Sequence, residues 1–303
     1  MSKVVTVNGE VDSKELGHIQ PHEHIFVDIS WVPNRWDFPV LEDYSQMKEE
    51  LMLYKSAGGG TLVDVTPLNC GRDPQKLQQI SRETGVHVVM GTSWYRAPYY
   101  PEIINKSTTN SLATLLEEEI RFGCGDSGIR PGIIGEIGID KRWIQGSEER
   151  VFRASARAAR STGLTITTHT PPHCAILLFD LLEEEKVNPE RIIFGHLDNT
   201  LESEYFLQII DKGCSVELDL IGMQHLNSDE RRAQLVIDLV RRGHIEKILL
   251  SMDIYTRPQL KTNNGFGYGY LIETFLPRLI QGGLNSEEIH VMTHVNPARH
   301  LEV

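Results

Sequence analysis

The segment GIIGEIGI, residues 132–139, decides the fold. Every position in it is apolar or glycine except Glu136. A strand that is apolar on both faces suits a parallel sheet covered by helices on both sides. We therefore predict that this segment is a buried strand of a parallel sheet.

Seven other short apolar runs share its character. They are HIFVDI near 24–29, TLVDVT at 61–66, VHVVMGTS at 86–93, LTITTH at 164–169, RIIFGH at 191–196, CSVELDL at 214–220 and KILLSMD at 247–253. Longer stretches with apolar and charged residues at helical spacing lie between them, at 42–58, 147–163, 228–244 and 269–283. Strands that alternate with helices indicate parallel strands with helical crossovers.

Eight such units predict an α/β fold of the (β/α)8 TIM-barrel type, with a doubly wound open sheet as the alternative. We expect residues 1–303 to form a single domain, in which a short N-terminal segment, about residues 1–17, caps the barrel. Barrels of this kind often reach about 250 residues or more as one domain.

Composition and net charge limit the classes of molecule that the protein is expected to bind. The formal net charge is -12, which argues against nucleic acid and anionic membranes, because phosphate binding depends on Lys and Arg. A small anionic substrate held by a local basic residue is compatible with this net charge. The N-terminus lacks the apolar core of a signal peptide, and the four cysteines are widely spaced without a CxxC pattern. We expect a cytoplasmic protein with reduced thiols.

Potential metal ligands fall repeatedly at the ends of the predicted strands, where barrel enzymes place their active sites. They are His22, His24, Glu136, His169, His196 and Asp253. Four imidazoles and two carboxylates could form two adjoining divalent-metal sites, and Glu136 can bridge them because a carboxylate has two oxygens. Zinc is the first choice for nitrogen-rich sites, with Mn, Co, Ni or Fe as alternatives.

Simpler interpretations apply to other motifs. A single histidine at a strand end is more often structural than a ligand, and we interpret His18 as structural or supporting. His173 is expected in a loop, because the two prolines of HTPPH disfavour a helix. GFGYGYL at 265–271 resembles a nucleotide loop only loosely, and no GK[ST] or G-x-S-x-G motif is present.

Together the motifs resemble the phosphotriesterase family of the amidohydrolase superfamily, over almost the whole chain. VNGEVDSKELGHIQPHEHIF resembles its entry segment, and VDVTPLNCGRDP its second strand and following loop. GEIG, TTHT, FGHLD and LLSMD match its strand-end sites in order. SMDIYTRPQLKTNNGFGYGYL resembles the branch of phosphotriesterase homology proteins.

The resemblance implies a role for each ligand. His22, His24 and Asp253 would hold the more buried ion, and His169 and His196 the more exposed one. Glu136 would bridge them, where many members use a carboxylated lysine. The chain also departs from well-known members. Leu220 stands where lactonases tend to have arginine, and Asn199 stands where phosphotriesterase has aspartate.

The expected activity is hydrolysis through a metal-bound hydroxide, with Asp253 as the catalytic residue that orients it and moves its proton. A carboxylic ester or lactone is preferred. A phosphoester, an N-acyl amide, a non-catalytic metal-binding barrel and a mononuclear deaminase are the alternatives. Substrate contacts are expected in the loops after the strands, and a homodimer by analogy. The candidate substrate contacts are Tyr95, Arg96, Arg257, Lys261 and Tyr268.

Overall fold

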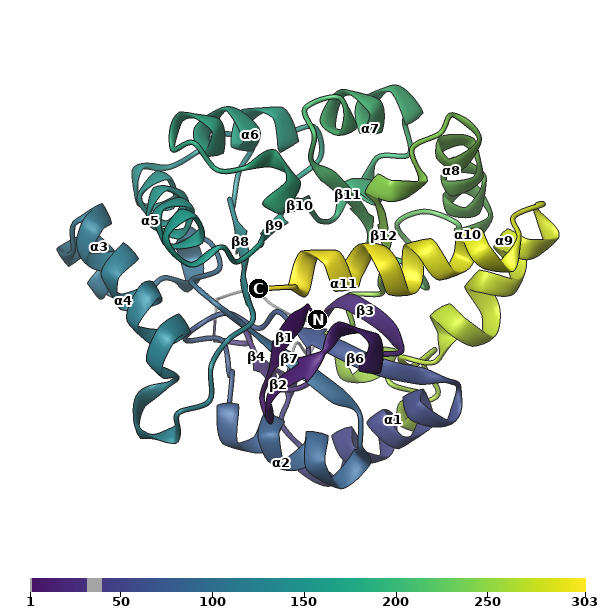
Figure 1. Cartoon of the computed structure of the whole chain (residues 1–303), viewed down its shortest axis with the longest axis horizontal. Coiled ribbons are helices and arrows are strands. Elements are labelled where there is room, and N and C mark those ends of the chain that lie inside the picture. Colours follow the sequence, from purple (N-terminus) through teal and green to yellow (C-terminus); the bar gives the residue numbers. More distant parts are fainter. Residues whose placement is uncertain (1, 32–39) are drawn as a thin grey trace.

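The computed structural model describes residues 2–31 and 40–303. Eight parallel strands stand side by side around a barrel and helices surround them (Figure 1), which confirms the predicted TIM-barrel class. In barrel order the strands are β3 (His18–Glu23), β6 (Gly59–Asp64), β7 (His87–Thr92), β8 (Ile133–Gly138), β9 (Ile166–His169), β10 (Ile192–Phe194), β11 (Ser215–Leu218) and β12 (Ile248–Leu250).

The first strand is the one whose prediction was wrong. It runs over His18–Glu23, not over 24–29. The apolar run that follows leaves the barrel, and there β4 (Val27–Asp28) pairs antiparallel with β5 (Val40–Leu41). Phe26, Val27 and Ile29 are nevertheless buried, in the hydrophobic cluster that also holds Met47 and Leu51. The apolar character of residues 24–29 predicted their burial correctly, but it did not predict whether they belong to the barrel sheet.

The helices follow the predicted alternation. Asp43 caps α1 (Tyr44–Ser56) by accepting from the backbone N–H of Gln46, a common helix start signal. Pro277 is accommodated because a π-helical turn, Leu271–Phe275, precedes it and α9 (Leu276–Gln281) begins beside it. The helices are α1 (Tyr44–Ser56), α2 (Pro74–Thr84), α3 (Ile103–Lys106), α4 (Thr109–Phe122), α5 (Gly146–Thr162), α6 (Ala175–Glu184), α7 (Ser203–Ile210), α8 (Asp229–Arg241), α9 (Leu276–Gln281), α10 (Ser286–His290) and α11 (Asn296–Leu301).

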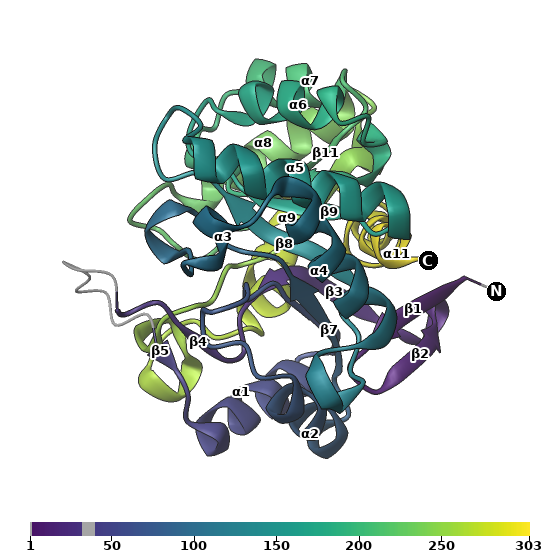
Figure 2. The same ribbon diagram turned by 90° about the vertical axis from the view of Figure 1, so that its left-hand side faces the viewer.

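The two mouths of the barrel differ. In Figure 2 the hairpin of β1 (Lys3–Thr6) and β2 (Gly9–Asp12) lies at the same end as α11, and β4 and β5 lie at the other. Val4 of β1 and Leu301 of α11 share one buried cluster with barrel residues such as Val63 and Ile133. The single domain with an N-terminal cap stays a prediction. Among the described residues, no helix combines the length and apolarity needed to cross a membrane.

Candidate metal centre

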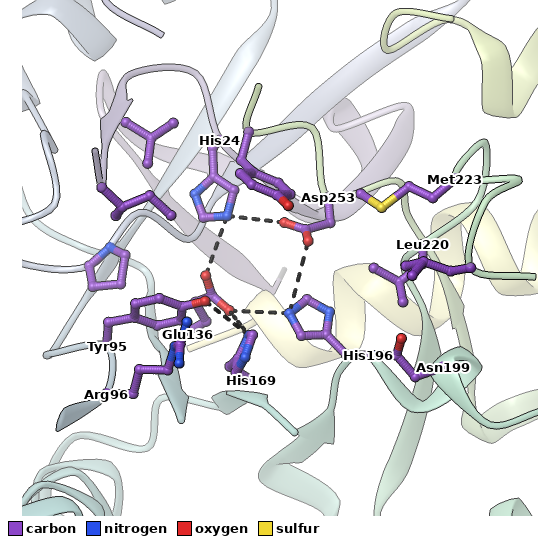
Figure 3. Close-up of a pocket in the computed structure, with 15 residues that line it drawn as sticks. His24, Tyr95, Arg96, Glu136, His169, His196, Asn199, Leu220, Met223 and Asp253 are labelled. Carbon is purple, nitrogen blue, oxygen red and sulfur yellow. Dashed lines mark hydrogen bonds and ion pairs between the residues drawn. The ribbon is translucent and has the colours of Figure 1, made fainter. Parts of the chain in front are cut away.

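The six expected ligands converge at the mouth formed by the C-terminal ends of the strands. Figure 3 labels all of them except His22. Each comes from a strand end, because parallel strands deliver their last residues to one rim. His22 lies in β3 and His24 just after it, Glu136 in β8, His169 at the end of β9, and His196 and Asp253 shortly after β10 and β12.

Glu136 lies at the centre of this group. Its Oε1 is 3.4 Å from His24 Nε2. Its Oε2 lies near three further ring nitrogens, at 3.6 Å from His22 Nε2, 3.3 Å from His169 Nδ1 and 3.5 Å from His196 Nε2. One carboxylate therefore faces both histidine pairs.

Asp253 spans the opposite side. Its Oδ1 is 3.2 Å from His24 Nε2 and 3.9 Å from His22 Nε2, and its Oδ2 is 3.9 Å from His196 Nε2. Among the described residues, three groups of suitable donor atoms each lie within 4.8 Å: His22, His24 and Asp253; Glu136, His169 and His196; and His22, His196 and Asp219. The first two are the groupings that the resemblance implied, with Glu136 included in the second.

Other residues orient the imidazoles. His22 Nδ1 is 3.3 Å from Glu217 Oε2 and 3.3 Å from Asp219 Oδ2. His196 Nδ1 is 2.9 Å from Asp219 Oδ1, and His24 Nδ1 is 2.9 Å from Thr66 Oγ1. These contacts occupy Nδ1 and aim Nε2 at the centre, as outer partners of metal-bound histidines do.

The donor set fits divalent cations. His22 Nε2 and Glu136 Oε2 are buried without a hydrogen-bond partner in the described part of the chain. Such atoms are costly to leave unpaired, and a cation between them would satisfy both. Imidazole nitrogens with carboxylate oxygens suit zinc and the neighbouring first-row metals.

The pKa shifts of the clustered side chains also favour a bound cation. Burial lowers the pKa of His24, but Asp253 and Glu136 outweigh it and raise that pKa to about 9. Burial opposes ionisation of Glu136 as well, yet its histidine neighbours hold its pKa well below the usual range. The carboxylates thus create a negative potential at the centre, which favours a bound cation.

Two of the candidate ligands have an uncommon backbone conformation. His196 and Asp253 both have left-handed conformations, with φ of 56° and 49°. Such conformations are uncommon outside glycine and cluster at functional sites. Gly195 lets this turn form, because a Cβ there would lie 2.6 Å from the Thr168 carbonyl oxygen and 2.8 Å from Asp219 Oδ2.

A cavity of about 210 Å³ opens above the ligands. One side is polar: Tyr95 Oη lies 3.2 Å from His169 Nδ1, and the guanidinium of Arg96 pairs with Asp140. Figure 3 shows Leu220 and Met223 on the opposite side. The mouth therefore offers a small site with one polar and one apolar wall.

Three other expected substrate contacts are not among the residues that line this cavity. Arg257 pairs with Glu42, and Lys261 pairs with Glu273. Tyr268 is buried beneath the site and donates its hydroxyl to the carbonyl oxygen of His24. Tyr95 and Arg96 do line the cavity.

Sequence reasoning missed the supporting carboxylates. Glu217 and Asp219 are fully buried, and they stand two positions apart at the end of a strand. Two acidic residues on one face of an otherwise apolar strand were the available signal. Thr66 and Tyr255 carried no such signal, because only the folded barrel brings their loops to the site.

Comparisons with known proteins agree with this geometry. A curated relative, the phosphotriesterase homology protein of Escherichia coli, is 34% identical over 93% of this chain and 97% of its own length. An N-acetyltaurine hydrolase of Salmo salar is 28% identical over 99% and 97%. The crystal structure of a lactonase from Listeria monocytogenes superposes with a TM-score of 0.93 at 25% identity, covering 99% of both chains.

The model of the Phosphotriesterase family matches residues 2–301, which include all six residues of the metal centre. With this match, the barrel and the converging histidines and carboxylates, the chain belongs to the phosphotriesterase family and is a metal-dependent hydrolase.

Proposed function

We propose that the protein hydrolyses a small carboxylic ester or lactone at a binuclear metal centre bridged by Glu136. The observation that carries this proposal is the position of the Glu136 carboxylate within 3.6 Å of four imidazole nitrogens. His22, His24 and Asp253 would hold one ion, and His169 and His196 the other. Zinc is our first choice of metal.

The ions would supply Lewis acidity, which polarises a carbonyl and lowers the pKa of coordinated water from about 15.7 toward about 7. Asp253 does the proton transfer in this scheme. One of its oxygens faces His24 and the other faces His196. One oxygen can therefore ligate a metal ion while the other accepts a proton from the water that attacks the carbonyl. It then delivers that proton to the leaving oxygen as the acyl bond breaks.

Tyr95 and the apolar wall position the substrate. Burial raises the pKa of Tyr95 well above its usual range, so its hydroxyl remains a donor at neutral pH. It can donate to a substrate oxygen held beside His169. Leu220, Met223 and Leu226 would contact an alkyl or ring portion of the substrate.

An N-acyl amide is the second candidate, and two observations favour it. Relatives that match almost the whole chain are N-acetyltaurine hydrolases. Arg96, whose guanidinium pairs with Asp140, is a cationic residue that lines the cavity. Arg96 would bind an anionic group on the amine portion. Phosphoester hydrolysis remains a third possibility for the assay panel.

Metal analysis and a substrate panel test the proposal. The protein reconstituted with Zn²⁺ should retain about two ions at the centre around Glu136, where one ion would favour a mononuclear centre. Lactones, esters, N-acyl amino acids, N-acyl taurines and phosphoesters should be assayed on that preparation. The proposed activity would be contradicted if no carbonyl substrate were hydrolysed, or if the metal-free protein retained full activity.

The Asp253→Asn variant tests the proton transfer. We expect kcat to fall by about 10²- to 10⁴-fold, the usual contribution of acid–base catalysis. Asp211→Asn, at an exposed position, is the matched control and should keep wild-type kcat. Full activity in Asp253→Asn with its metals bound would exclude this role. A cytoplasmic location and a homodimer stay predictions.

A further inference from the structure

Three histidines gather at the other end of the barrel, far from the metal centre in the fold. His18 begins β3, His290 ends α10, and His294 lies in the following π-helical turn, Val291–Val295. The rings of His290 and His294 stack with centroids 4.4 Å apart, and the His18 ring meets His294 edge-on at 5.8 Å. His290 and His294 also line a cavity of about 550 Å³.

Hydrogen bonding fixes the tautomer of His18. The hydroxyl of Tyr54 has a single proton, and the carbonyl oxygens of His18 and Thr61 lie 3.1 and 2.9 Å from it as acceptors. The hydroxyl oxygen must therefore accept from His18 Nδ1, 3.3 Å away. His18 Nε2 is left with a lone pair, and it is buried without a partner in the described residues.

The same argument applies to His294. Thr293 Oγ1 donates to the carbonyl oxygen of Ile289 at 2.8 Å, so it accepts from His294 Nδ1, also at 2.8 Å. The Nε2 atom of His294 then carries the lone pair. Burial and the neighbouring His290 lower the pKa of His294 to about 4, and burial and His294 lower the pKa of His18 to about 3. Both rings are neutral at pH 7, as metal ligation requires.

We propose that His290, His294 and His18 form a transition-metal site, separate from the hydrolytic centre, that takes Zn²⁺, Ni²⁺ or Cu²⁺. Neutral imidazoles that present lone pairs suit these ions. Residues four apart on a helix face the same side, which allows His290 and His294 to chelate one ion. Glu302 also lines the cavity, and its carboxylate can add an oxygen ligand.

An anion site is the competing interpretation, because Lys14 and Arg299 line the same cavity. The lone pairs of neutral His18 and His294 would repel an anion, and Arg299 is already paired with Glu246 at 3.2 Å. The three histidines are not among the described groups whose donor atoms lie within 4.8 Å of one another. The exposed His290 ring must therefore turn to complete the site.

Equilibrium dialysis against rising Zn²⁺, with bound metal counted by elemental analysis, tests the site. Wild type should bind one equivalent more than the double variant His290→Gln/His294→Gln, whatever the occupancy of the hydrolytic centre. The control variant His244→Gln, which removes a histidine elsewhere, should bind as wild type does. Hydrolase activity should be unchanged in both variants, because His290, His294 and His244 all lie outside the residues that line the catalytic cavity.

The variant His18→Gln tests the third ligand. It should weaken binding of the additional ion by more than the roughly 10- to 100-fold typical of an outer-shell partner. A urea unfolding curve on metal-free protein checks that the variant is folded. Equal stoichiometry in wild type and His290→Gln/His294→Gln would overturn the site, and unchanged affinity in folded His18→Gln would overturn the three-histidine assignment.

Discussion

Asp219 contacts two of the imidazoles at the metal centre. Its Oδ1 lies 2.9 Å from His196 Nδ1 and its Oδ2 3.3 Å from His22 Nδ1. Both oxygens also accept from the backbone N–H of His196 at 2.9 Å. One buried carboxylate thereby contacts ligands of both proposed ions, since His22 is proposed to hold one ion and His196 the other.

Replacing Asp219 by asparagine should weaken metal binding. The amide nitrogen cannot accept, so one of the bonds to the His196 backbone or to the imidazoles is lost. We expect affinity for Zn²⁺ to fall by about 10- to 100-fold, as for other outer-shell partners. Competition with a chelator measures this fall, and Asp211→Asn serves as the control. Unchanged zinc retention would show that Asp219 does not position the ligands.

At the scale of elements, α11 is held against the N-terminal ends of the strands through His300. Its carbonyl oxygen accepts from Thr165 Oγ1 at 2.7 Å, and its Nε2 lies 2.8 Å from Ser215 Oγ at the start of β11. Burial lowers the pKa of His300 to about 3, with a further contribution from Arg299, Arg191 and Lys247. The helix thus docks through a histidine that must stay neutral.

This packing predicts an acid-sensitive fold. Below pH 6.5 the unfolded chain takes up a proton on His300 that the folded protein does not, so stability falls as the pH falls toward 3. The loss is about 1.4 kcal/mol per pH unit. Between pH 7.5 and pH 5, wild type should lose about 2 kcal/mol more unfolding free energy than His300→Gln, whose side chain does not titrate.

Urea melts at the two pH values measure this difference. Groups other than His300 titrate equally in both proteins, so they cancel in the comparison. The exposed His225→Gln is the control and should follow the wild-type profile. Parallel pH profiles for wild type and His300→Gln would contradict the assignment.

At the scale of the molecule, Glu23 joins the last strand to the first. The backbone N–H groups of Met252 and Ile254 donate to it at 2.9 Å, and Ser251 Oγ lies 2.8 Å from its Oε1. Backbone bonds from Asp253 to His22 and from His24 to Ile254 cross the same seam. Closure of the barrel therefore also sets the distance between His22, His24 and Asp253.

The Glu23→Gln variant should loosen this seam. An amide would face the Ile254 N–H or the Met252 N–H as a second donor, and a buried donor without an acceptor costs about 1–3 kcal/mol. We expect a lower urea midpoint together with reduced zinc retention, because the ligands on both sides of the seam lose register. Glu49→Gln, at an exposed helical position, should change neither. If Glu23→Gln lost stability but retained all of its zinc, the contacts that close the barrel would not control metal binding.

Local pattern determined much of this protein. The apolar runs located seven of the eight barrel strands, because a strand buried on both faces must be apolar along its length. The order of His22, His24, Glu136, His169, His196 and Asp253 along the chain sufficed to place them on one rim, since parallel strands share a direction. The first strand was misplaced because its apolar neighbour at 24–29 is buried outside the sheet.

Only the tertiary structure decided which side chains share a site. Tyr95 and Arg96 line the cavity, whereas Arg257 and Lys261, which were equally eligible by sequence, do not line it and pair with Glu42 and Glu273. The outer partners of the ligands and the histidine cluster at the opposite mouth likewise unite residues from distant segments. Sequence records the residue types and their periodicity, but contacts between remote segments depend on barrel closure and on the competition among charged neighbours in the folded chain.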